Sequence, residues 1–339
     1  MVRVATSCNQ NCVPVPRGRR IRELWRRPKV ATEPILGALD LVAVQRRRRL
    51  AISGVLFDYW KLTKPEVNFL IVITTAAGFW MGTVAVLASF PWMPFLHTLL
   101  GTAFVACGAA TLNQLIELRY DAQMRRTARR PLVSGRIAPS HGLWFGVLLS
   151  ALGAVYLALA TNVIASLLAT LTLLSYLFLY TPLKRISPLC TLVGAMPGAV
   201  PPLIGWAAAR GRLDPDAWML FAIVFLWQFP HFMSIAWMYR EDYASAGYLV
   251  LPASELKDRF VAWQSLLPAL GLFVVAIVPA LRGQSGIVYF AGALVLGGVF
   301  LYYGVRFALQ RSTACARQLL FTSILYLPVL FALLALDKK

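Results

Sequence analysis

The hydrophobic residues of this chain are gathered into long stretches that short polar segments separate. A helix needs roughly 20 apolar residues to cross about 30 Å of hydrocarbon. None of the stretches alternates between apolar and polar positions, as the strands of a membrane barrel do. The pattern therefore predicts about nine transmembrane helices, near residues 67–88, 92–118, 142–160, 163–180, 189–208, 216–238, 262–281, 286–305 and 317–336.

The composition supports the same interpretation. Hydrophobic residues make up 59% of the 339 residues and charged residues only 14%, whereas roughly 25% of the residues in a soluble domain are charged. This departure is too large for a soluble core. We therefore expect an all-α membrane protein.

Basic residues are concentrated in the first part of the chain. The formal net charge is +19, and 14 of the 33 Lys and Arg residues precede position 65, including the run from Arg46 to Arg49. A basic segment beside a membrane domain is attracted to anionic lipid, and this placement favours a lipid surface over nucleic acid as its partner. Residues 1–56 are predicted to be a basic, disordered cytoplasmic extension, and residues 57–339 the membrane domain.

The loops between the spans indicate the orientation. Those after the second, fourth, sixth and eighth spans are rich in Lys and Arg, whereas those on the other side hold only Arg210, Arg212 and Arg282. Because cytoplasmic loops carry the excess of basic residues, the N-terminus and the even-numbered loops are predicted to be cytoplasmic. Most acidic residues of the membrane domain fall on this side in two clusters, and ionisable groups near membrane depth indicate a functional site.

The first acidic cluster closes the second span with Asn113, Glu117 and Asp121. Residues four apart advance only about 40° around a helix, so these side chains share one sector and are stacked about 6 Å apart. Oxygen ligands in this arrangement suit Mg²⁺, which one or two carboxylates hold together with substrate phosphates. The alternative is a helix end whose acids pair with neighbouring arginines.

Basic side chains follow this cluster and also close the fourth span. Arg is suited to bidentate phosphate binding, so we expect a diphosphate to bind between the acids and these bases. At the fourth span the alternative is the ordinary basic charge of a cytoplasmic loop. The predicted diphosphate-binding residues are Arg125, Arg129, Arg130, Tyr180, Lys184, Arg185 and Arg240.

The sixth span supplies a histidine and is followed by the second acidic cluster. Glu241 and Asp242 are able to hold a second cation or to orient Arg240. His231 lies in an apolar, aromatic segment, where it is either a packed, hydrogen-bonded residue or a group that contacts substrate or transfers a proton. The predicted catalytic residues are Asn113, Glu117, Asp121, Lys184, Arg240, Asp242 and His231, and the predicted metal ligands are Asn113, Glu117, Asp121, Glu241 and Asp242.

Together these segments resemble the UbiA-type intramembrane prenyltransferases, and within them the branch that acts on haem. The resemblance covers about residues 57 to 336, and the haem branch is indicated by Pro201-Pro202-Leu203-Ile204-Gly205-Trp206 and by Trp227-Gln228-Phe229-Pro230-His231-Phe232. Gln114 and Glu117 stand where the first superfamily motif usually has Asp, and Asp121 is retained. Arg240-Glu241-Asp242 replaces the second motif.

The resemblance implies a helical bundle around a central cavity that opens toward the cytoplasmic side, so that residues 57–339 form an intramembrane prenyltransferase domain. It also implies Mg²⁺ or Mn²⁺ as cofactor and farnesyl diphosphate as donor, with the farnesyl tail along apolar walls. Haem B (protohaem IX) is the implied acceptor and a substrate, not a cofactor. The family adds farnesyl to a haem vinyl group with water supplying a hydroxyl, which gives haem O for terminal oxidases.

Two alternatives remain open at this point. A sister enzyme would use the same diphosphate site but an aromatic quinone precursor as acceptor, and a membrane transporter would perform no chemistry. We expect the chain in the bacterial plasma membrane, with the mitochondrial inner membrane as the alternative. The expected partners are the lipid bilayer and, among proteins, haem A synthase or a terminal oxidase.

Overall fold

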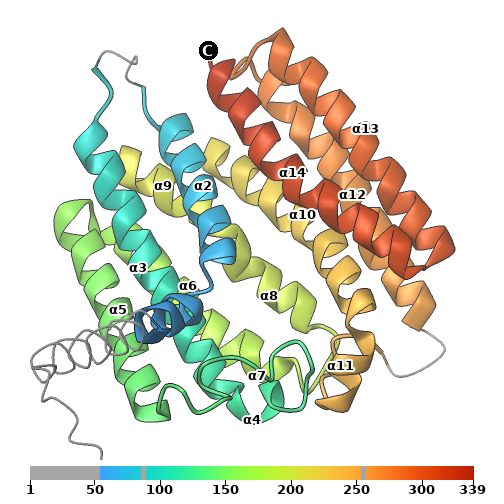
Figure 1. Cartoon of the computed structure of the whole chain (residues 1–339). Helices are drawn as coiled ribbons and strands as arrows, with labels where there is room; N and C mark the ends of the chain where they lie inside the picture. The colour runs from blue at the N-terminus through green and yellow to red at the C-terminus, as the bar shows by residue number, and fades with distance from the viewer. Residues whose placement is uncertain (1–53, 85–88, 253–256) are drawn as a thin grey trace, which may run out of the picture. The chain divides into compact units, whose positions relative to one another are not determined.

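The computed structural model describes residues 54–84, 89–252 and 257–339, so the predicted extension at 1–56 lies almost wholly outside it. Helices form nearly all of the regular structure (Figure 1), which confirms the all-α prediction. The elements are α2 (Pro65–Gly82), α3 (Trp92–Ile116), α4 (Leu118–Asp121), α5 (Pro139–Ala160), α6 (Val163–Leu174), a π-helical turn (Ser175–Tyr180), α7 (Thr181–Leu183), α8 (Cys190–Ala199), α9 (Pro201–Arg210), α10 (Pro215–Met238), α11 (Arg240–Ser245), α12 (Lys257–Leu281), α13 (Ile287–Gln310) and α14 (Thr313–Leu336).

Within the described residues, eight helical segments are long and apolar enough to cross a membrane. They correspond to the second to ninth predicted spans, with ends shifted by a few residues. Helix α2 occupies the position of the first predicted span but is not among the eight, because Glu66 and Asn68 near its start lower its hydrophobicity. The total of nine spans therefore stays a prediction.

Two of the predicted spans are interrupted helices. The span at Val163–Leu183 changes from α6 into the π-helical turn, and the Thr181 hydroxyl donates a hydrogen bond to the Tyr176 carbonyl at 2.8 Å. The span at Cys190–Arg210 divides into α8 and α9 at Val200. Pro201 and Pro202 follow directly, and because proline has no N–H it cannot continue the hydrogen bonding of α8.

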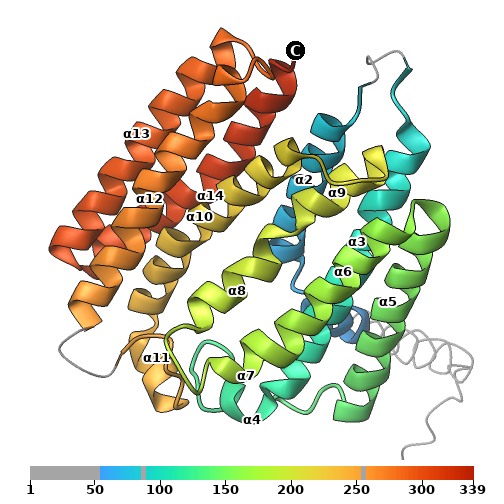
Figure 2. The same cartoon turned by 180° about the vertical axis from the view of Figure 1, so that it is seen from behind.

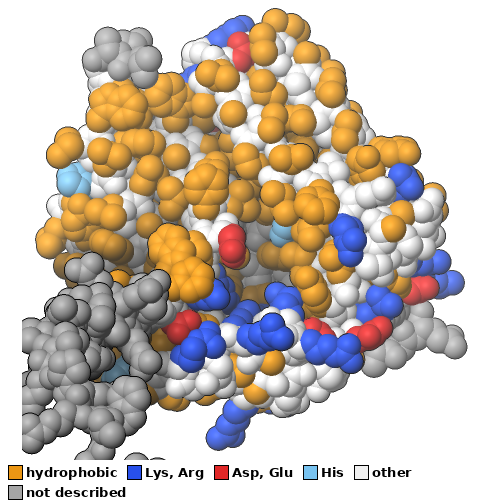
Figure 3. Space-filling model, viewed as in Figure 1, with side chains coloured by type: hydrophobic (Ala, Val, Ile, Leu, Met, Phe, Trp, Pro, Cys, Tyr) orange, Lys and Arg blue, Asp and Glu red, His pale blue; other side chains and the backbone are white. Residues whose placement is uncertain are grey.

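The helices form two groups with three further helices between them. Helices α10, α12, α13 and α14 pack against one another on one side, and α3, α5 and α6 on the other, with α2, α8 and α9 between (Figures 1 and 2). The short helices α4, α7 and α11 gather at one end of the bundle, opposite the C-terminus. On the face in Figure 3, hydrophobic side chains cover the helices, while Lys and Arg gather along the end that holds α4 and α11.

Helices α2 and α9 pack closely through glycines. A Cβ on Gly205 would lie 2.0 Å from the carbonyl oxygen of Thr75, and a Cβ on Gly78 would lie 2.0 Å from that of Pro202. We expect Gly205→Ala to destabilise the protein by about 1–3 kcal/mol, because the obstructing atom belongs to the backbone of a neighbouring helix and cannot rotate away. Thermal or denaturant unfolding of the purified protein in detergent measures this change.

Gly298 on α13 provides the matched control. A Cβ at this position would meet no atom within 4 Å, and alanine is favoured over glycine in a helix by roughly 0.8–1 kcal/mol. Gly298→Ala should therefore be neutral or stabilising. Equal changes in the two variants would show that α2 and α9 are not in close contact.

Candidate active site

The predicted acid–amide cluster lies where α3 passes into α4. Asn113 belongs to the last turns of α3, Glu117 stands between the two helices and Asp121 ends α4. The backbone N–H of Glu117 donates to the Asn113 carbonyl at 3.0 Å, and that of Asp121 donates to the Glu117 carbonyl at 2.8 Å. The helical register therefore continues across the junction, and all three side chains are buried, with 1%, 6% and 1% of their residue surface exposed, respectively.

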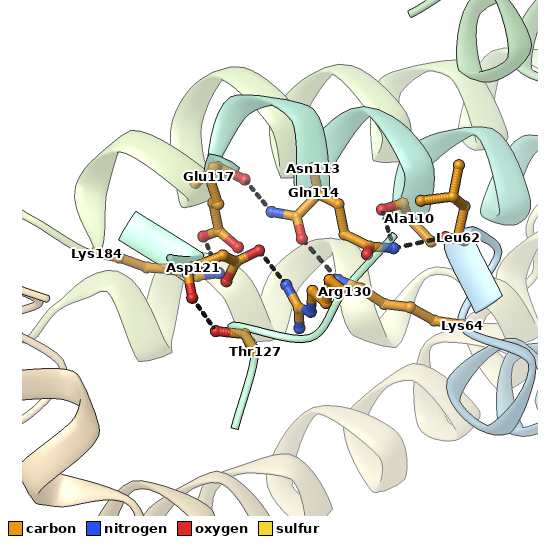
Figure 4. Close-up of polar contacts among 11 residues, drawn as sticks. Leu62, Lys64, Ala110, Asn113, Gln114, Glu117, Asp121, Thr127, Arg130 and Lys184 are labelled. Atoms are coloured by element: carbon orange, nitrogen blue, oxygen red, sulfur yellow. Dashed lines mark hydrogen bonds and ion pairs between the residues drawn. The ribbon is translucent and has the colours of Figure 1, made fainter. Parts of the chain in front are cut away.

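Three cations from separate parts of the chain face this cluster (Figure 4). The Lys64 Nζ donates a hydrogen bond to the Asn113 Oδ1 at 2.8 Å, and the Lys184 Nζ pairs with the Glu117 Oε1 at 2.7 Å. The Arg130 guanidinium pairs with the Asp121 carboxylate. Lys64 precedes α2, Lys184 follows α7 and Arg130 lies in the loop after α4. Groups that lie far apart in the sequence thus form one buried charged centre.

Burial and neighbouring charges act in opposite directions on these groups. Burial disfavours the carboxylate of Glu117, but the ammonium groups of Lys184 and Lys64 outweigh it and hold the pKa of Glu117 below its ordinary value. Burial outweighs Arg130 at Asp121 and raises the pKa of that carboxyl. Burial, assisted by the like charge of Arg130, lowers the pKa of Lys64 to about 7. The centre therefore offers both signs of charge to a bound ion.

Lys64 is a site residue that the sequence analysis missed. It has φ 48° and ψ 62°, a left-handed conformation directly before Pro65. A non-glycine residue in this region costs about 1–3 kcal/mol, and such strain gathers at functional sites. The available signal was a lysine immediately before an apolar helix, on the side of the chain where the acids lie.

The acid–amide cluster offers the oxygen ligands that a hard cation prefers. Its side chains offer oxygen atoms, and the Asp121 Oδ1 is buried without a hydrogen-bond partner in the structure. A buried carboxylate oxygen left unpaired is costly, and a divalent cation would satisfy it. Across the described residues, no group of three or more His, Cys, Asp or Glu side chains forms a metal site. Any cation would thus rely on the amide, the two carboxylates and substrate oxygens.

The residues predicted at the fourth span lie next to this cluster. The Lys184 ammonium lies 4.5 Å from the centre of the Tyr180 ring. The Arg185 guanidinium is directed to Tyr120 instead, with its Nη1 donating to the Tyr120 hydroxyl at 2.6 Å and its centre 4.3 Å from the ring centre. Tyr180 and Lys184 thus lie together beside Glu117, while Arg185 binds the surface of α4.

The second acidic cluster lies on a different surface. The Arg240 guanidinium contacts the Glu241 carboxylate at 3.8 Å, and the Glu241 side chain is 85% exposed. The Asp242 Oδ2 accepts a hydrogen bond from the Arg126 N–H at 3.2 Å. A cavity of about 470 Å³ is lined by Arg125, Arg126, Met238, Tyr239, Glu241 and Asp242. Arg125 and Arg129 are exposed, so among the predicted arginines of the loop after α4 it is Arg130 that reaches the acids.

The segment after α11 connects the two clusters. The Leu249 N–H donates to the Lys184 carbonyl at 2.7 Å, and the Tyr248 ring packs against the rings of Tyr120 and Tyr243, at centroid distances of 5.8 Å and 6.0 Å. Burial and the carboxylate of Glu117 raise the pKa of Tyr248. The sequence analysis missed Tyr248, because no local pattern places this segment over the acids.

His231 lies in the interior of α10. Its ring stacks on Trp227, with centroids 4.8 Å apart and an interplanar angle of 23°. Its Nδ1 lies 2.8 Å from the Ser323 Oγ on α14. The histidine is thus held between α10 and α14, in the group formed by α10, α12, α13 and α14.

Comparison with known proteins gives the family. Residues 71–325 match the model of the UbiA prenyltransferase family. A protohaem IX farnesyltransferase from Solibacter usitatus is 49% identical over 287 residues, which cover 83% of this chain and 98% of the relative. The protohaem IX farnesyltransferase from Koribacter versatilis is 44% identical over 298 residues, which cover 86% of this chain and 96% of the relative.

The fold is also that of solved family members. A UbiA homologue from Archaeoglobus fulgidus, solved with GPP and Mg²⁺, is similar with a TM-score of 0.55 and 17% identity, covering 82% of this chain and 99% of that one. These comparisons confirm the resemblance that the motifs indicated. The chain belongs to the UbiA prenyltransferase family.

Proposed function

We propose that this chain transfers a farnesyl group from farnesyl diphosphate to a vinyl group of protohaem IX with addition of water, giving haem O. The observation that carries the proposal is the buried cluster of Asn113, Glu117 and Asp121 that three cations face. It lies in a chain 49% identical to a protein named protohaem IX farnesyltransferase. A buried centre with both signs of charge suits the binding of a cation together with a diphosphate.

Glu117 and Asp121, assisted by Asn113, are the proposed ligands of Mg²⁺, with Mn²⁺ as a substitute. The buried, unpaired Asp121 Oδ1 supports this assignment, as does the relative that was solved with GPP and Mg²⁺. When bound, the cation supplies Lewis-acid stabilisation of the charge that develops on the diphosphate. The amide and the two carboxylates of the cluster offer enough oxygen atoms for one such ion, and Glu241 and Asp242 are proposed ligands of a second.

Lys64, Lys184 and Arg130 are proposed to bind the diphosphate oxygens. Their charged groups already lie 2.7–2.8 Å from the cluster or in direct contact with it, so they can change partners from protein oxygens to substrate oxygens with little movement. Fixed cations in a site that excludes water stabilise developing negative charge more strongly than solvent does. Tyr180 holds Lys184 in place.

The reaction breaks the C1–O bond of farnesyl diphosphate, and the electron pair leaves on the diphosphate. The terminal vinyl carbon of haem forms a bond to the resulting allylic cation, and the adjacent carbon becomes positive. Water adds to that carbon and loses one proton, which gives the hydroxyl. The apolar walls protect the cation from early capture by water. His231 is proposed to contact the haem.

The remaining predicted residues are proposed to form a basic rim. Arg125, Arg129, Arg185 and Arg240 lie on or near the exposed surface around the site, where they attract an anionic diphosphate. Asp242 is proposed to keep the loop after α4 in place through its hydrogen bond with the Arg126 N–H. We further propose that the rim faces the cytoplasm of a bacterium, or the matrix side of a mitochondrial inner membrane, and that haem O passes to haem A synthase or a terminal oxidase.

Expression in a bacterial host that lacks its own farnesyl transfer to haem tests the proposal. Cells that carry the chain are expected to accumulate haem O, and cells that carry the empty vector are not. A quinone-precursor enzyme would leave the haems unchanged and produce a prenylated aromatic compound. A transporter would release no diphosphate from farnesyl diphosphate in proteoliposomes.

A further inference from the structure

His231 and its neighbour Trp227 both contact Ser323 on α14. The Trp227 Nε1 donates to the Ser323 carbonyl at 2.9 Å, and the His231 Nδ1 meets the Ser323 hydroxyl at 2.8 Å. Because the imidazole also stacks on the Trp227 ring, both the plane and the rotation of the histidine ring are determined. A ring held in this way presents its remaining nitrogen in one direction.

The hydrogen bonds of Ser323 determine which nitrogen of His231 carries the proton. The Ser323 hydroxyl donates to the Leu320 carbonyl at 2.6 Å, and a hydroxyl has only one proton to give. Toward His231 the Ser323 oxygen must therefore accept, so the proton is on Nδ1. In a neutral imidazole the Nε2 then carries a lone pair.

The Nε2 atom is left unused by the protein. In the part of the chain that the structure describes, it forms no hydrogen bond, and no carboxylate pairs with the ring. His231 is only partly buried. A histidine that served packing alone would be expected to satisfy both nitrogens, as buried polar groups usually do.

We propose that the Nε2 of His231 binds the iron of protohaem as an axial ligand. A histidine that ligates a metal nearly always donates its other N–H to an acceptor, which fixes the tautomer and increases the basicity of the ligand. Here the acceptor is the hydroxyl oxygen of Ser323. Axial histidine ligation is a common way of holding haem iron. The inference rests on the proposed function, because it takes protohaem to be the acceptor.

Iron ligation would give the acceptor a fixed point on α10. A porphyrin held only by apolar contacts can slide along the walls of a cavity, whereas one held at its iron can only rotate about the iron–nitrogen bond. His231 would thus act as a positioning residue for the vinyl group. This role differs from proton transfer, because it requires the metal in the porphyrin.

Optical and electron paramagnetic resonance spectra of the purified full chain with added protohaem test the proposal. Wild-type protein is expected to show nitrogen ligation of the iron, and His231→Ala to lose it and to bind protohaem at least about tenfold more weakly. Added imidazole should restore the ligated spectrum of the variant. Ser323→Ala should keep the ligand but weaken binding, because the Nδ1–H loses its acceptor.

Two controls separate ligation from packing. Metal-free protoporphyrin IX should bind wild type and His231→Ala equally. His97→Ala should retain the wild-type spectrum, because His97 lies at the opposite end of α3 from Asn113, where its Nδ1 contacts the Tyr156 hydroxyl at 2.6 Å.

Several outcomes would overturn the inference. An unchanged spectrum in His231→Ala would do so, as would an equal loss of affinity for the iron-free porphyrin, which would indicate packing. Formation of haem O by a wild-type protein without nitrogen ligation would refute the inference and leave the proposed function intact. Nitrogen ligation by a wild-type protein that forms no haem O would refute the proposed function alone.

Discussion

Replacement of Asp121 by Asn is expected to abolish measurable farnesyl transfer, a loss of at least about a hundredfold in turnover. Asp121 has 1% of its surface exposed, one oxygen paired with Arg130 and the other without a partner. Asparagine keeps the size of the side chain but removes its charge and one of its two oxygens. The proposed cation therefore loses a ligand at the position where the diphosphate leaves.

The variant should remain folded and inserted in the membrane, since Asn can still accept a hydrogen bond from Arg130. Asp58→Asn is the matched control, because Asp58 pairs with Arg136 in a partly exposed ion pair at 2.8 Å and such pairs contribute only about 0–1 kcal/mol. The rate of haem O formation and the thermal unfolding of the purified protein are measured for both variants. Full haem O production by Asp121→Asn would remove Asp121 from the metal site.

Removal of divalent cations is expected to stop farnesyl transfer as completely as the replacement of Asp121 does. Lys64, Lys184 and Arg130 already neutralise the acid–amide cluster, so without an added cation the site lacks the charge to hold a diphosphate as well. Purified protein treated with EDTA should lose farnesyl transfer and regain it with Mg²⁺ or Mn²⁺. Its binding of protohaem, followed by the absorption spectrum, should be unaffected.

Undiminished activity after EDTA treatment would contradict the proposed metal chemistry. In that case Glu117 and Asp121 would have to act through Lys184 and Arg130 alone. If EDTA abolished both farnesyl transfer and protohaem binding, it would be acting on the fold. The absorption spectrum thus serves as an internal control for the same sample.

Most of the helical architecture could be predicted, because a span in lipid is a long apolar run that does not depend on its neighbours. The described interior of each predicted span is helical in the structure, apart from the break at Val200 in the fifth. The interruptions of the helices were harder to predict. Pro201 and Pro202 indicate the break at Val200, but nothing local in residues 175–180 distinguishes a π-helical turn from an α-helix. The first span stays a prediction, because Glu66 and Asn68 lie inside α2 and lower its hydrophobicity.

The candidate site shows the same division between local and distant information. The spacing of Asn113, Glu117 and Asp121 is a property of one helix, so their stacking follows from the sequence alone. Which cation meets which acid depends on loops and on helices far apart in the chain. Lys64 lies 49 residues from Asn113, and sequence spacing cannot identify such a partner.

The product formed by purified protein from farnesyl diphosphate, protohaem IX and Mg²⁺ tests the central claim most directly. Mass spectrometry of the extracted haem should show protohaem heavier by one farnesyl group and one hydroxyl group, in step with the release of diphosphate. Unmodified haem, with the farnesyl group still attached to its diphosphate, would contradict the account.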